Sequence, residues 1–157
     1  MTTNTNTINT LDTTDIDVVV LANGEYPCNE IPLSLINRGI PIVCCDGAIA
    51  KLDQQAIAPI AVIGDGDSIS QHLKDKYQSL WHYIAEQETN DLTKAVTYCI
   101  EHKFKHIAIL GATGMREDHT LGNISLLMEY TKNRGNAIAP FNNIMHEGVN
   151  VDIVTDN

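Results

Sequence analysis

Short apolar runs alternate with segments of helical periodicity from Asp17 onward, and this alternation restricts the possible folds more than any other feature of the sequence. Several runs, such as Val18–Ala22, are apolar throughout instead of alternating between apolar and polar residues. Strands of this kind are typical of a parallel sheet that is covered on both faces. The runs indicate six strands: Val18–Ala22, Pro41–Cys45, Ala61–Gly64, Trp81–Ala85, His106–Leu110 and Val149–Thr155.

The intervals between these runs carry the periodicity of helices. The helix that begins near residue 90 is the clearest, because its apolar residues form one stripe after a Thr89 or Asn90 cap. The alternation predicts a doubly wound, mostly parallel α/β sheet of about six strands with helices on both faces, in a Rossmann-like three-layer arrangement. This domain would span residues 17–157, after a polar, disordered leader at residues 1–16. The predicted helices are Glu30–Asn37, Ala48–Gln54, Ser70–Leu80, Asn90–His102 and Asp118–Asn133.

Net charge and hydropathy exclude several classes of partner. The chain has 20 acidic and 10 basic residues, which gives a net charge of −10 at pH 7. Such a charge opposes binding to a nucleic-acid backbone or to an anionic membrane. No stretch approaches the roughly 20 apolar residues of a membrane-spanning helix, and the Thr- and Asn-rich N-terminus does not resemble a secretory signal. We therefore expect a soluble, cytoplasmic protein that binds neither nucleic acid nor membrane.

Two aspartates one residue apart follow the third predicted strand. Asp65 and Asp67 stand in the sequence Ile63-Gly64-Asp65-Gly66-Asp67-Ser68, and a further acidic cluster, Glu86–Asp91, opens the fourth predicted helix. Carboxylates this close repel one another unless a cation lies between them, and Mg²⁺ binds one or two carboxylates while leaving positions for substrate phosphates. The pattern therefore predicts a magnesium site. The alternative is a simple turn in which Ser68 caps the next helix.

Polar or glycine-rich segments follow five of the predicted strands. In an open parallel sheet, ligands bind beyond the carboxyl ends of the strands. These segments would therefore share one edge of the sheet and form a binding site there, although loops lie at strand ends in every fold of this kind. The segments are Asn23-Gly24, Asp46-Gly47, Asp65–Ser68, Gln87–Asp91 and Gly111–Gly114.

The segment Gly111–His119 joins a predicted strand to a predicted helix. Glycines in such a loop allow backbone N–H groups to approach an anion near the helix N-terminus, so the segment is a candidate phosphate-binding loop to which Arg116 adds a positive charge. The alternative is a tight turn with a solvated arginine. In that alternative Asp118 caps the following helix and His119 lies on its surface.

Asp91, Lys94 and Asp46 also have two interpretations each. Asp91 and Lys94 are three residues apart on a predicted helix, so they either pair on its surface or bind a metal and a phosphate, respectively. Asp46 belongs either to a common Asp-Gly turn or to the proposed acidic site.

Taken in order, four motifs resemble those of the thiamine pyrophosphokinase (thiamin diphosphokinase) family, over about Val18 to Leu127. The resemblance implies the N-terminal catalytic domain of an enzyme that transfers the β,γ-pyrophosphoryl group of ATP to the hydroxyl of thiamine and gives thiamine diphosphate and AMP with Mg²⁺. It also implies a homodimer. The motifs are Asp46-Gly47-Ala48; Pro59 followed by Ile63–Ser68; Gln87–Asp91 with Leu92, Lys94 and Ala95; and Gly111–Thr120 with Asn123.

The resemblance also assigns roles to individual residues. Asp46, Asp65, Asp67 and Asp91 would form the catalytic cluster, in which the last three bind the metal. Asp67 or Asp91 would accept the proton of the thiamine hydroxyl. Substrate contacts are implied for Ser68 and Asn90. The implied ATP-binding residues are Gln87, Lys94, Gly111, Thr113, Gly114, Arg116 and Asp118.

The chain departs from the family pattern in several places. Gly66 stands where the family usually has a bulkier residue, Met115 where a second glycine is common, and Ala48 where Asp-Gly-Gly is common. The family's C-terminal β-sandwich domain, which contributes to the thiamine site and the dimer interface, has no counterpart before Asn157. The segment Gly135–Gly148 is long for a connection and has no assigned role.

Two other functions remain open from the sequence. One is a truncated, non-catalytic domain that binds Mg²⁺-nucleotide but has lost the acceptor pocket. The other is a different Mg²⁺-dependent enzyme, such as a phosphatase or a nucleotidyl transferase, that uses Asp65-Gly66-Asp67.

Overall fold

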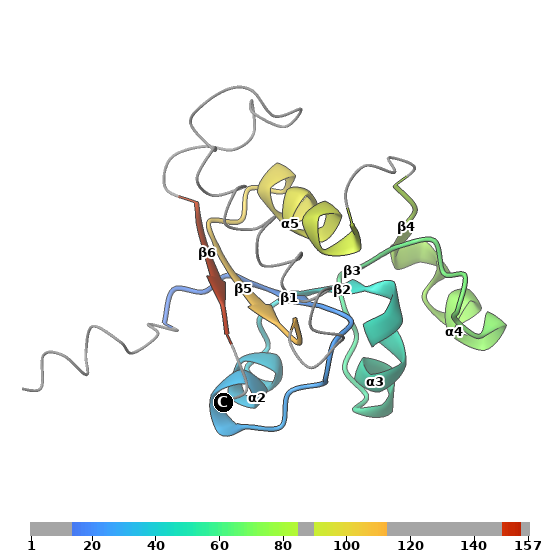
Figure 1. Cartoon of the computed structure of the whole chain (residues 1–157), viewed down its shortest axis with the longest axis horizontal. Helices are drawn as coiled ribbons and strands as arrows, with labels where there is room; N and C mark the ends of the chain where they lie inside the picture. The colour runs from blue at the N-terminus through green and yellow to red at the C-terminus, as the bar shows by residue number, and fades with distance from the viewer. Residues whose placement is uncertain (1–13, 85–89, 113–148, 155–157) are drawn as a thin grey trace, which may run out of the picture.

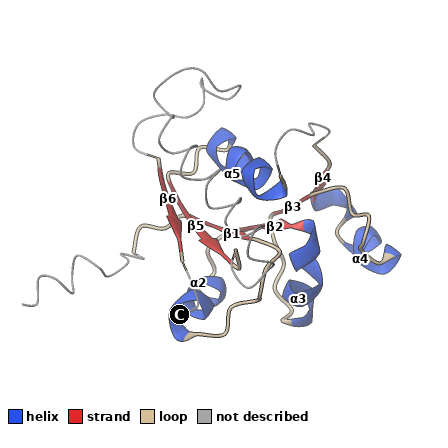
Figure 2. Cartoon of the chain, viewed as in Figure 1, coloured by secondary structure: helices blue, strands red, loops and turns tan. Residues whose placement is uncertain are grey.

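The computed structural model describes residues 14–84, 90–112 and 149–154. Every strand in these residues lies within a predicted strand, so the strand predictions are confirmed, although β4 is only two residues long. Figures 1 and 2 show the strands as one layer between the helices. The strands are β1 (Val18–Leu21), β2 (Ile42–Cys45), β3 (Ala61–Ile63), β4 (Trp81–His82), β5 (His106–Leu110) and β6 (Asn150–Ile153).

The described helices are α2 (Glu30–Asn37), α3 (Ile49–Gln54), α4 (Gln71–Lys76) and α5 (Asp91–Glu101), with 3-10 turns η1 (Asp46–Ala48) and η2 (Gln78–Leu80) beside α3 and α4. The predicted helix Ser70–Leu80 is therefore two shorter pieces. The break falls at Tyr77, whose hydroxyl donates a hydrogen bond of 2.5 Å to Asp53 of α3. A tertiary contact thus interrupts a segment whose sequence favours one helix. The predicted helix Asp118–Asn133 lies outside the described residues.

All strand pairs in the described sheet are parallel, and the strand order is β4-β3-β2-β1-β5-β6. The chain adds three strands outward from one side of β1 and then returns to place β5 on the other side. The predicted doubly wound, mostly parallel α/β fold is confirmed. Such a reversal leaves a crevice at the carboxyl ends of the two strands where the direction changes, here β1 and β5, and ligands bind at this point in sheets of this type.

Two hydrophobic cores lie on opposite faces of the sheet. Val18 and Val20 belong to one core and Val19 to the other, because successive side chains of a strand point to opposite faces. The apolar stripe of α5 covers the first core, whereas α2 and α3 cover the second, as Figure 2 shows. Cys44 and Cys45 are divided between the two cores in the same way. These packing contacts produce the three layers that the sequence predicts.

The fold begins before the predicted boundary at Asp17. Ile16 is buried, and the Asp15 carboxylate lies 2.9 Å from Nδ1 of His106. The predicted leader, residues 1–16, is therefore too long at its C-terminal end. The remainder of that prediction, residues 1–13, falls outside the described part of the chain.

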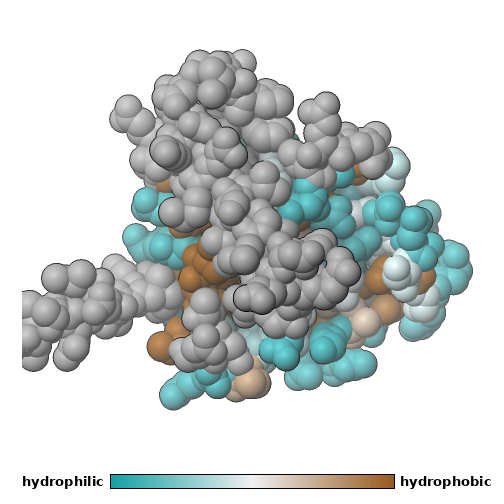
Figure 3. Space-filling view, viewed as in Figure 1, coloured by the Kyte–Doolittle hydropathy of each residue, from teal (hydrophilic) through white to brown (hydrophobic). Residues whose placement is uncertain are grey.

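The described surface is mixed in character. Figure 3 shows mainly hydrophilic atoms over α4, and apolar atoms beside β6, where Val151, Ile153 and Val154 are only partly buried. Among residues 14–84, 90–112 and 149–154, no helix is both long enough and apolar enough to cross a membrane.

Candidate active site

The carboxyl edge of the sheet carries polar and glycine-rich segments from separate parts of the chain. Because the strands are parallel, the residues that follow β1, β2, β3 and β5 meet at this edge. The start of α5 packs against the same strands through its apolar stripe. The segments that the structure describes there are Asn23-Gly24, η1, Gly64–Asp67, Asn90-Asp91 and Gly111-Ala112.

Asp46 connects the ends of β2 and β3. Its Oδ2 atom accepts a hydrogen bond of 2.9 Å from the backbone N–H of Gly66. A Cβ added to Gly64, which has a φ of +145°, would lie 2.4 Å from Cγ of Asp46. Glycine is therefore required at position 64 both for the backbone conformation and for the space that the carboxylate occupies. Asp46 is more than a turn residue, because its side chain is held across the neighbouring strand end.

The Asp65-Gly66-Asp67 segment is a tight turn that leaves both aspartates exposed. Oδ1 of Asp65 accepts a hydrogen bond of 3.0 Å from the backbone N–H of Asp67. The cap of the next helix is Ser70, whose hydroxyl accepts from the N–H of Leu73. The segment is thus a turn, as the alternative interpretation predicts, but that interpretation is wrong about Ser68 as the cap. Ser68 is exposed in the same loop.

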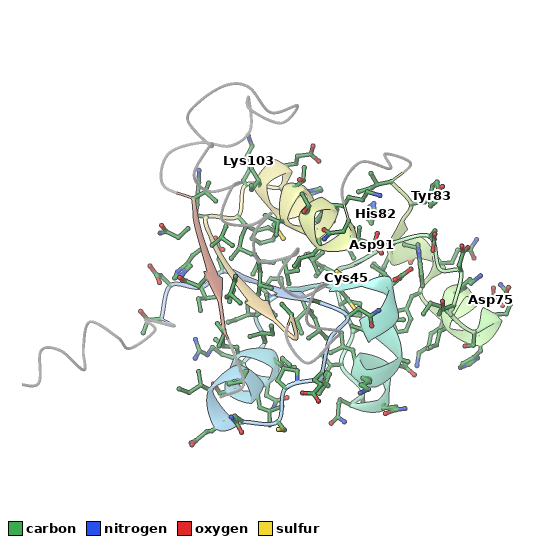
Figure 4. The ribbon with its side chains drawn as sticks, in the orientation of Figure 1. Cys45, Asp75, His82, Tyr83, Asp91 and Lys103 are labelled. Atoms are coloured by element: carbon green, nitrogen blue, oxygen red, sulfur yellow. The ribbon has the colours of Figure 1, made fainter. Side chains whose placement is uncertain are left out.

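Asp91 brings another carboxylate to this edge, at the first residue of α5, and Figure 4 shows it close to Cys45 of β2. Burial raises the pKa of Asp91, the charge of Asp46 raises it further, Lys94 lowers it, and Asp65 again raises it. Two carboxylates from other segments, Asp46 and Asp65, therefore act on Asp91. The Cys45 thiol in β2 is affected by the same charges. Burial raises its pKa, and neighbouring charges that include Asp91 and Asp46 raise it further.

Asn90 and Lys94 make contacts that hold α5 in place. Oδ1 of Asn90 accepts a hydrogen bond of 2.9 Å from the N–H of Thr93, so Asn90 is the helix cap. Nζ of Lys94 donates to the carbonyl of Ile84 over 3.4 Å. None of the ion pairs among the described residues joins Lys94 to Asp91, so the surface pair that the spacing suggests is not formed there.

The ends of β1 and β5 form the other half of this edge. The backbone N–H of Gly24 donates to the carbonyl of Gly111 over 2.7 Å. Gly111 has a φ of +72°, and a Cβ there would lie 3.0 Å from the carbonyl oxygen of Ala22. The turn after β5 therefore begins with a close approach of two backbones. Gly111 is the first residue of the predicted phosphate-binding loop.

Five of the predicted ATP-binding residues lie outside the described residues, so their prediction is not tested: Gln87, Thr113, Gly114, Arg116 and Asp118. His119 lies outside them as well. Of the other predicted residues, Asp46, Asp65 and Asp91 are brought together as argued above. The backbone of Asp67 joins the same turn.

Two contacts of the site are missing from the sequence-based prediction. Nε1 of Trp81 donates a hydrogen bond of 2.9 Å to the carbonyl of Gly64. The side chain of Asn23 lies against Gly47, since a Cβ on that glycine would fall 2.2 Å from its amide atoms. The available signals are weak: Trp81 is the single tryptophan of the chain, and Asn23 directly precedes a glycine at a strand end.

The donor set suits a hard divalent cation. Carboxylate oxygens are the protein ligands that such cations prefer. Burial is the main cause of the raised pKa of Asp91, the charges of Asp46 and Asp65 add to it, and a bound cation would stabilise the ionised carboxylate. Among the described residues, no three His, Cys, Asp or Glu side chains are gathered into a finished metal cage. The residues therefore fit a cation whose coordination is completed by substrate oxygens.

Comparison with known proteins adds independent evidence. Residues 33–139 match the family model described as "Thiamin pyrophosphokinase, catalytic domain". Thiamin pyrophosphokinase 1 from Caenorhabditis elegans is 30% identical over 123 residues, which cover 72% of this chain and 50% of that protein. Thiamine pyrophosphokinase from Bacillus subtilis is 37% identical over 90 residues, which cover 55% of this chain and 42% of that protein. The chain thus spans about half the length of the curated relatives it matches.

Solved structures share the fold. The crystal structure of thiamine pyrophosphokinase from Bacillus subtilis superposes with a TM-score of 0.64 at 23% identity, over 87% of this chain and 59% of that chain. Thiamin pyrophosphokinase from Candida albicans gives a TM-score of 0.63 at 22% identity, over 90% of this chain and 59% of that chain.

Proposed function

The chain belongs to the thiamin pyrophosphokinase family, as a catalytic domain, and on this premise we propose that it transfers the pyrophosphoryl group of Mg²⁺-ATP to the hydroxyl of thiamine. The products would be thiamine diphosphate and AMP. This proposal rests on the hydrogen bond from the Gly66 N–H to the Asp46 carboxylate, which joins Asp46 to the loop that carries Asp65, and on the charges of Asp46 and Asp65 that act on Asp91.

Mg²⁺ would be held by Asp65, Asp67 and Asp91 and would supply positive charge that neutralises the phosphate oxygens. Asp46 holds the backbone of the loop that presents Asp65 and Asp67, through its bond to Gly66. ATP is proposed to be held by Lys94 and Gly111 together with the predicted residues that lie outside the described part of the chain, which are Gln87, Thr113, Gly114, Arg116 and Asp118. Ser68 and Asn90 are proposed substrate contacts, although the Asn90 side chain also caps α5.

In the transfer, the oxygen of the thiamine hydroxyl forms a bond to the β-phosphorus of ATP, and the bond between that phosphorus and the α-β bridging oxygen breaks. AMP leaves with the bridging oxygen. The hydroxyl proton passes to a carboxylate, for which Asp67 and Asp91 are the candidates.

The proposal includes a cytoplasmic location and a homodimer. The four cysteines, all among the described residues, form no disulfide, and three of them are buried, which suits a reducing compartment. The dimer rests on the family resemblance.

Product analysis tests the proposed function. The chain is incubated with ATP, Mg²⁺ and thiamine, and nucleotides are separated by chromatography. We expect AMP and thiamine diphosphate in equal amounts, and neither when Mg²⁺ is chelated. Binding of Mg²⁺-ATP without any product would instead identify a nucleotide-binding domain. Release of free phosphate or of a nucleoside diphosphate would identify a different Mg²⁺-dependent enzyme.

A further inference from the structure

Trp81, the first residue of β4, contacts the acidic loop on both sides of Asp65. Its indole N–H donates to the carbonyl of Gly64 over 2.9 Å. A Cβ on Gly66 would lie 3.1 Å from Cζ2 of the same ring. The ring also packs against the core that α2 and α3 cover, so it is anchored in the fold. One side chain therefore ties the residue before Asp65 and the residue after it to the sheet.

The loop needs such an anchor because glycines flank Asp65. Gly64 and Gly66 have φ values of +145° and +74°. A glycine leaves such a conformation easily because it has no Cβ to restrict its backbone. Asp65 and Asp67 are exposed, and their like charges repel each other in the absence of a cation. A loop of this kind would sample many arrangements unless a neighbouring element held its backbone.

The environment of Gly66 also explains a departure from the family pattern. The aliphatic part of Lys74 lies on this residue, 3.4 Å from the position of an added Cβ, while the Trp81 ring lies at 3.1 Å. An added Cβ would lie tight against the Trp81 ring and in ordinary contact with Lys74, and a side chain at position 66 would also need a positive φ. The Trp81 ring therefore occupies the space that a side chain at position 66 would need.

We propose that Trp81 is a positioning residue for metal binding: it fixes the backbone of Asp65-Gly66-Asp67 so that the carboxylates meet Mg²⁺-ATP in one geometry, without touching the ligand itself. This inference rests on the proposed function. Preorganisation of this kind strengthens binding because the loop does not have to be ordered when the ligand arrives.

Trp81→Phe tests the proposal, because phenylalanine keeps an aromatic ring in the core and removes the indole N–H. Titration calorimetry with Mg²⁺-ATP is expected to show an affinity about three- to tenfold weaker than wild type, the effect of losing one hydrogen bond that orders the loop. The Mg²⁺ concentration that gives half-maximal ATP binding should rise by a similar factor.

Tyr77→Phe is the matched control. It also removes one aromatic hydrogen-bond donor, but the hydroxyl that is lost bonds to Asp53 of α3 instead of to the acidic loop. Thermal unfolding should show a loss of stability in both variants, but only Trp81→Phe should weaken Mg²⁺-ATP binding. Equal weakening in both variants would show a general effect of destabilisation and would overturn the inference.

The fluorescence of Trp81, the single tryptophan of the chain, provides a second readout in the wild-type protein. Its emission should change with Mg²⁺-ATP and saturate at the affinity that calorimetry gives. If wild type binds and Trp81→Phe binds equally well, the inference fails and the proposed function stands. If wild type does not bind Mg²⁺-ATP, the proposed function itself fails and the inference fails with it.

Discussion

The carboxylate of Asp46 accepts a hydrogen bond of 2.9 Å from the backbone N–H of Gly66, although the two residues follow different strands and lie 20 positions apart in the chain. This bond places a negative charge next to the loop that carries Asp65 and Asp67. The bond also fixes the end of β2 relative to the end of β3. The acidic edge is therefore an arrangement of several strand ends, not a property of one motif.

Replacement of Asp46 should separate its structural role from its electrostatic role. Asp46→Ala leaves the Gly66 N–H without its partner, and we expect the free energy of unfolding in urea to fall by about 1–2 kcal/mol. Asp46→Asn keeps an acceptor oxygen and should retain most of that stability. Both variants lose the charge, so both should weaken Mg²⁺-ATP binding. Equal stability of the two variants would contradict the role of the hydrogen bond.

Gly64→Ala should damage the site more than its position in a loop suggests. The added methyl group would collide with the Asp46 side chain, and the backbone is at a φ of +145°. Gly39→Ala is the control, because Gly39 also has a positive φ, +92°, but an added Cβ there meets no atom within 4 Å. We expect a loss of about 1 kcal/mol for Gly39→Ala from backbone strain and a clearly larger loss for Gly64→Ala. Only Gly64→Ala should also weaken Mg²⁺-ATP binding.

Asp91→Asn should stabilise the protein without ligand and weaken its function. Burial and the charges of Asp46 and Asp65 raise the pKa of Asp91, so its ionised form is unfavourable in the folded state at neutral pH. The neutral amide removes this cost, and we expect the Tm without ligand to rise. Product formation should fall at the same time. A lower Tm would mean that the charge of Asp91 stabilises the fold.

The stability of the sheet edge should depend on pH through His106. Its Nδ1 and Nε2 atoms lie 2.9 Å from Asp15 and 2.5 Å from Asp152, and its backbone N–H donates to Asp17. Burial opposes protonation, but the hydrogen bonds and charges of Asp152 and Asp15 outweigh it and raise the pKa of His106. The contribution of the charged ring is thus complete below about pH 6.5, the ordinary value, and disappears as the pH rises through the raised value.

Urea unfolding of wild type and His106→Gln at several pH values measures this contribution. The stability difference should be largest at pH 6 or below and should shrink as the pH rises above 6.5. His72→Gln, which replaces an exposed histidine of α4, is measured alongside as the control substitution. A difference for His106→Gln that stays constant with pH would show that the ring acts through packing alone.

The layers of this fold can be predicted from the sequence because they follow local patterns. Apolar runs such as Val18–Ala22 and the stripe of α5 mark their own positions, and α2 begins and ends at the predicted residues. The helix predicted for Ser70–Leu80 is wrong in its length, because the hydrogen bond between Tyr77 and Asp53 joins residues far apart in the chain. Local propensity contains no information about such a contact.

The sequence predicts only the part of the candidate site that follows from the topology of the sheet. Parallel strands bring their carboxyl ends together, and by this rule Asp46, Asp65 and Asp91 lie at one edge of the sheet. The contact between Trp81 and Gly64 depends on side-chain packing between strand ends 17 residues apart, so no spacing rule predicts it. The cap of α4 is Ser70 instead of Ser68.

Calorimetric titration of ATP into the wild-type chain and into an Asp65→Asn, Asp67→Asn double variant, each with Mg²⁺ and with chelator, tests the central claim most directly. The account predicts that wild type binds ATP with Mg²⁺, that chelation weakens this binding at least about tenfold, and that the double variant loses the Mg²⁺-dependent part. ATP binding of equal affinity in the double variant, or in wild type without Mg²⁺, would contradict it.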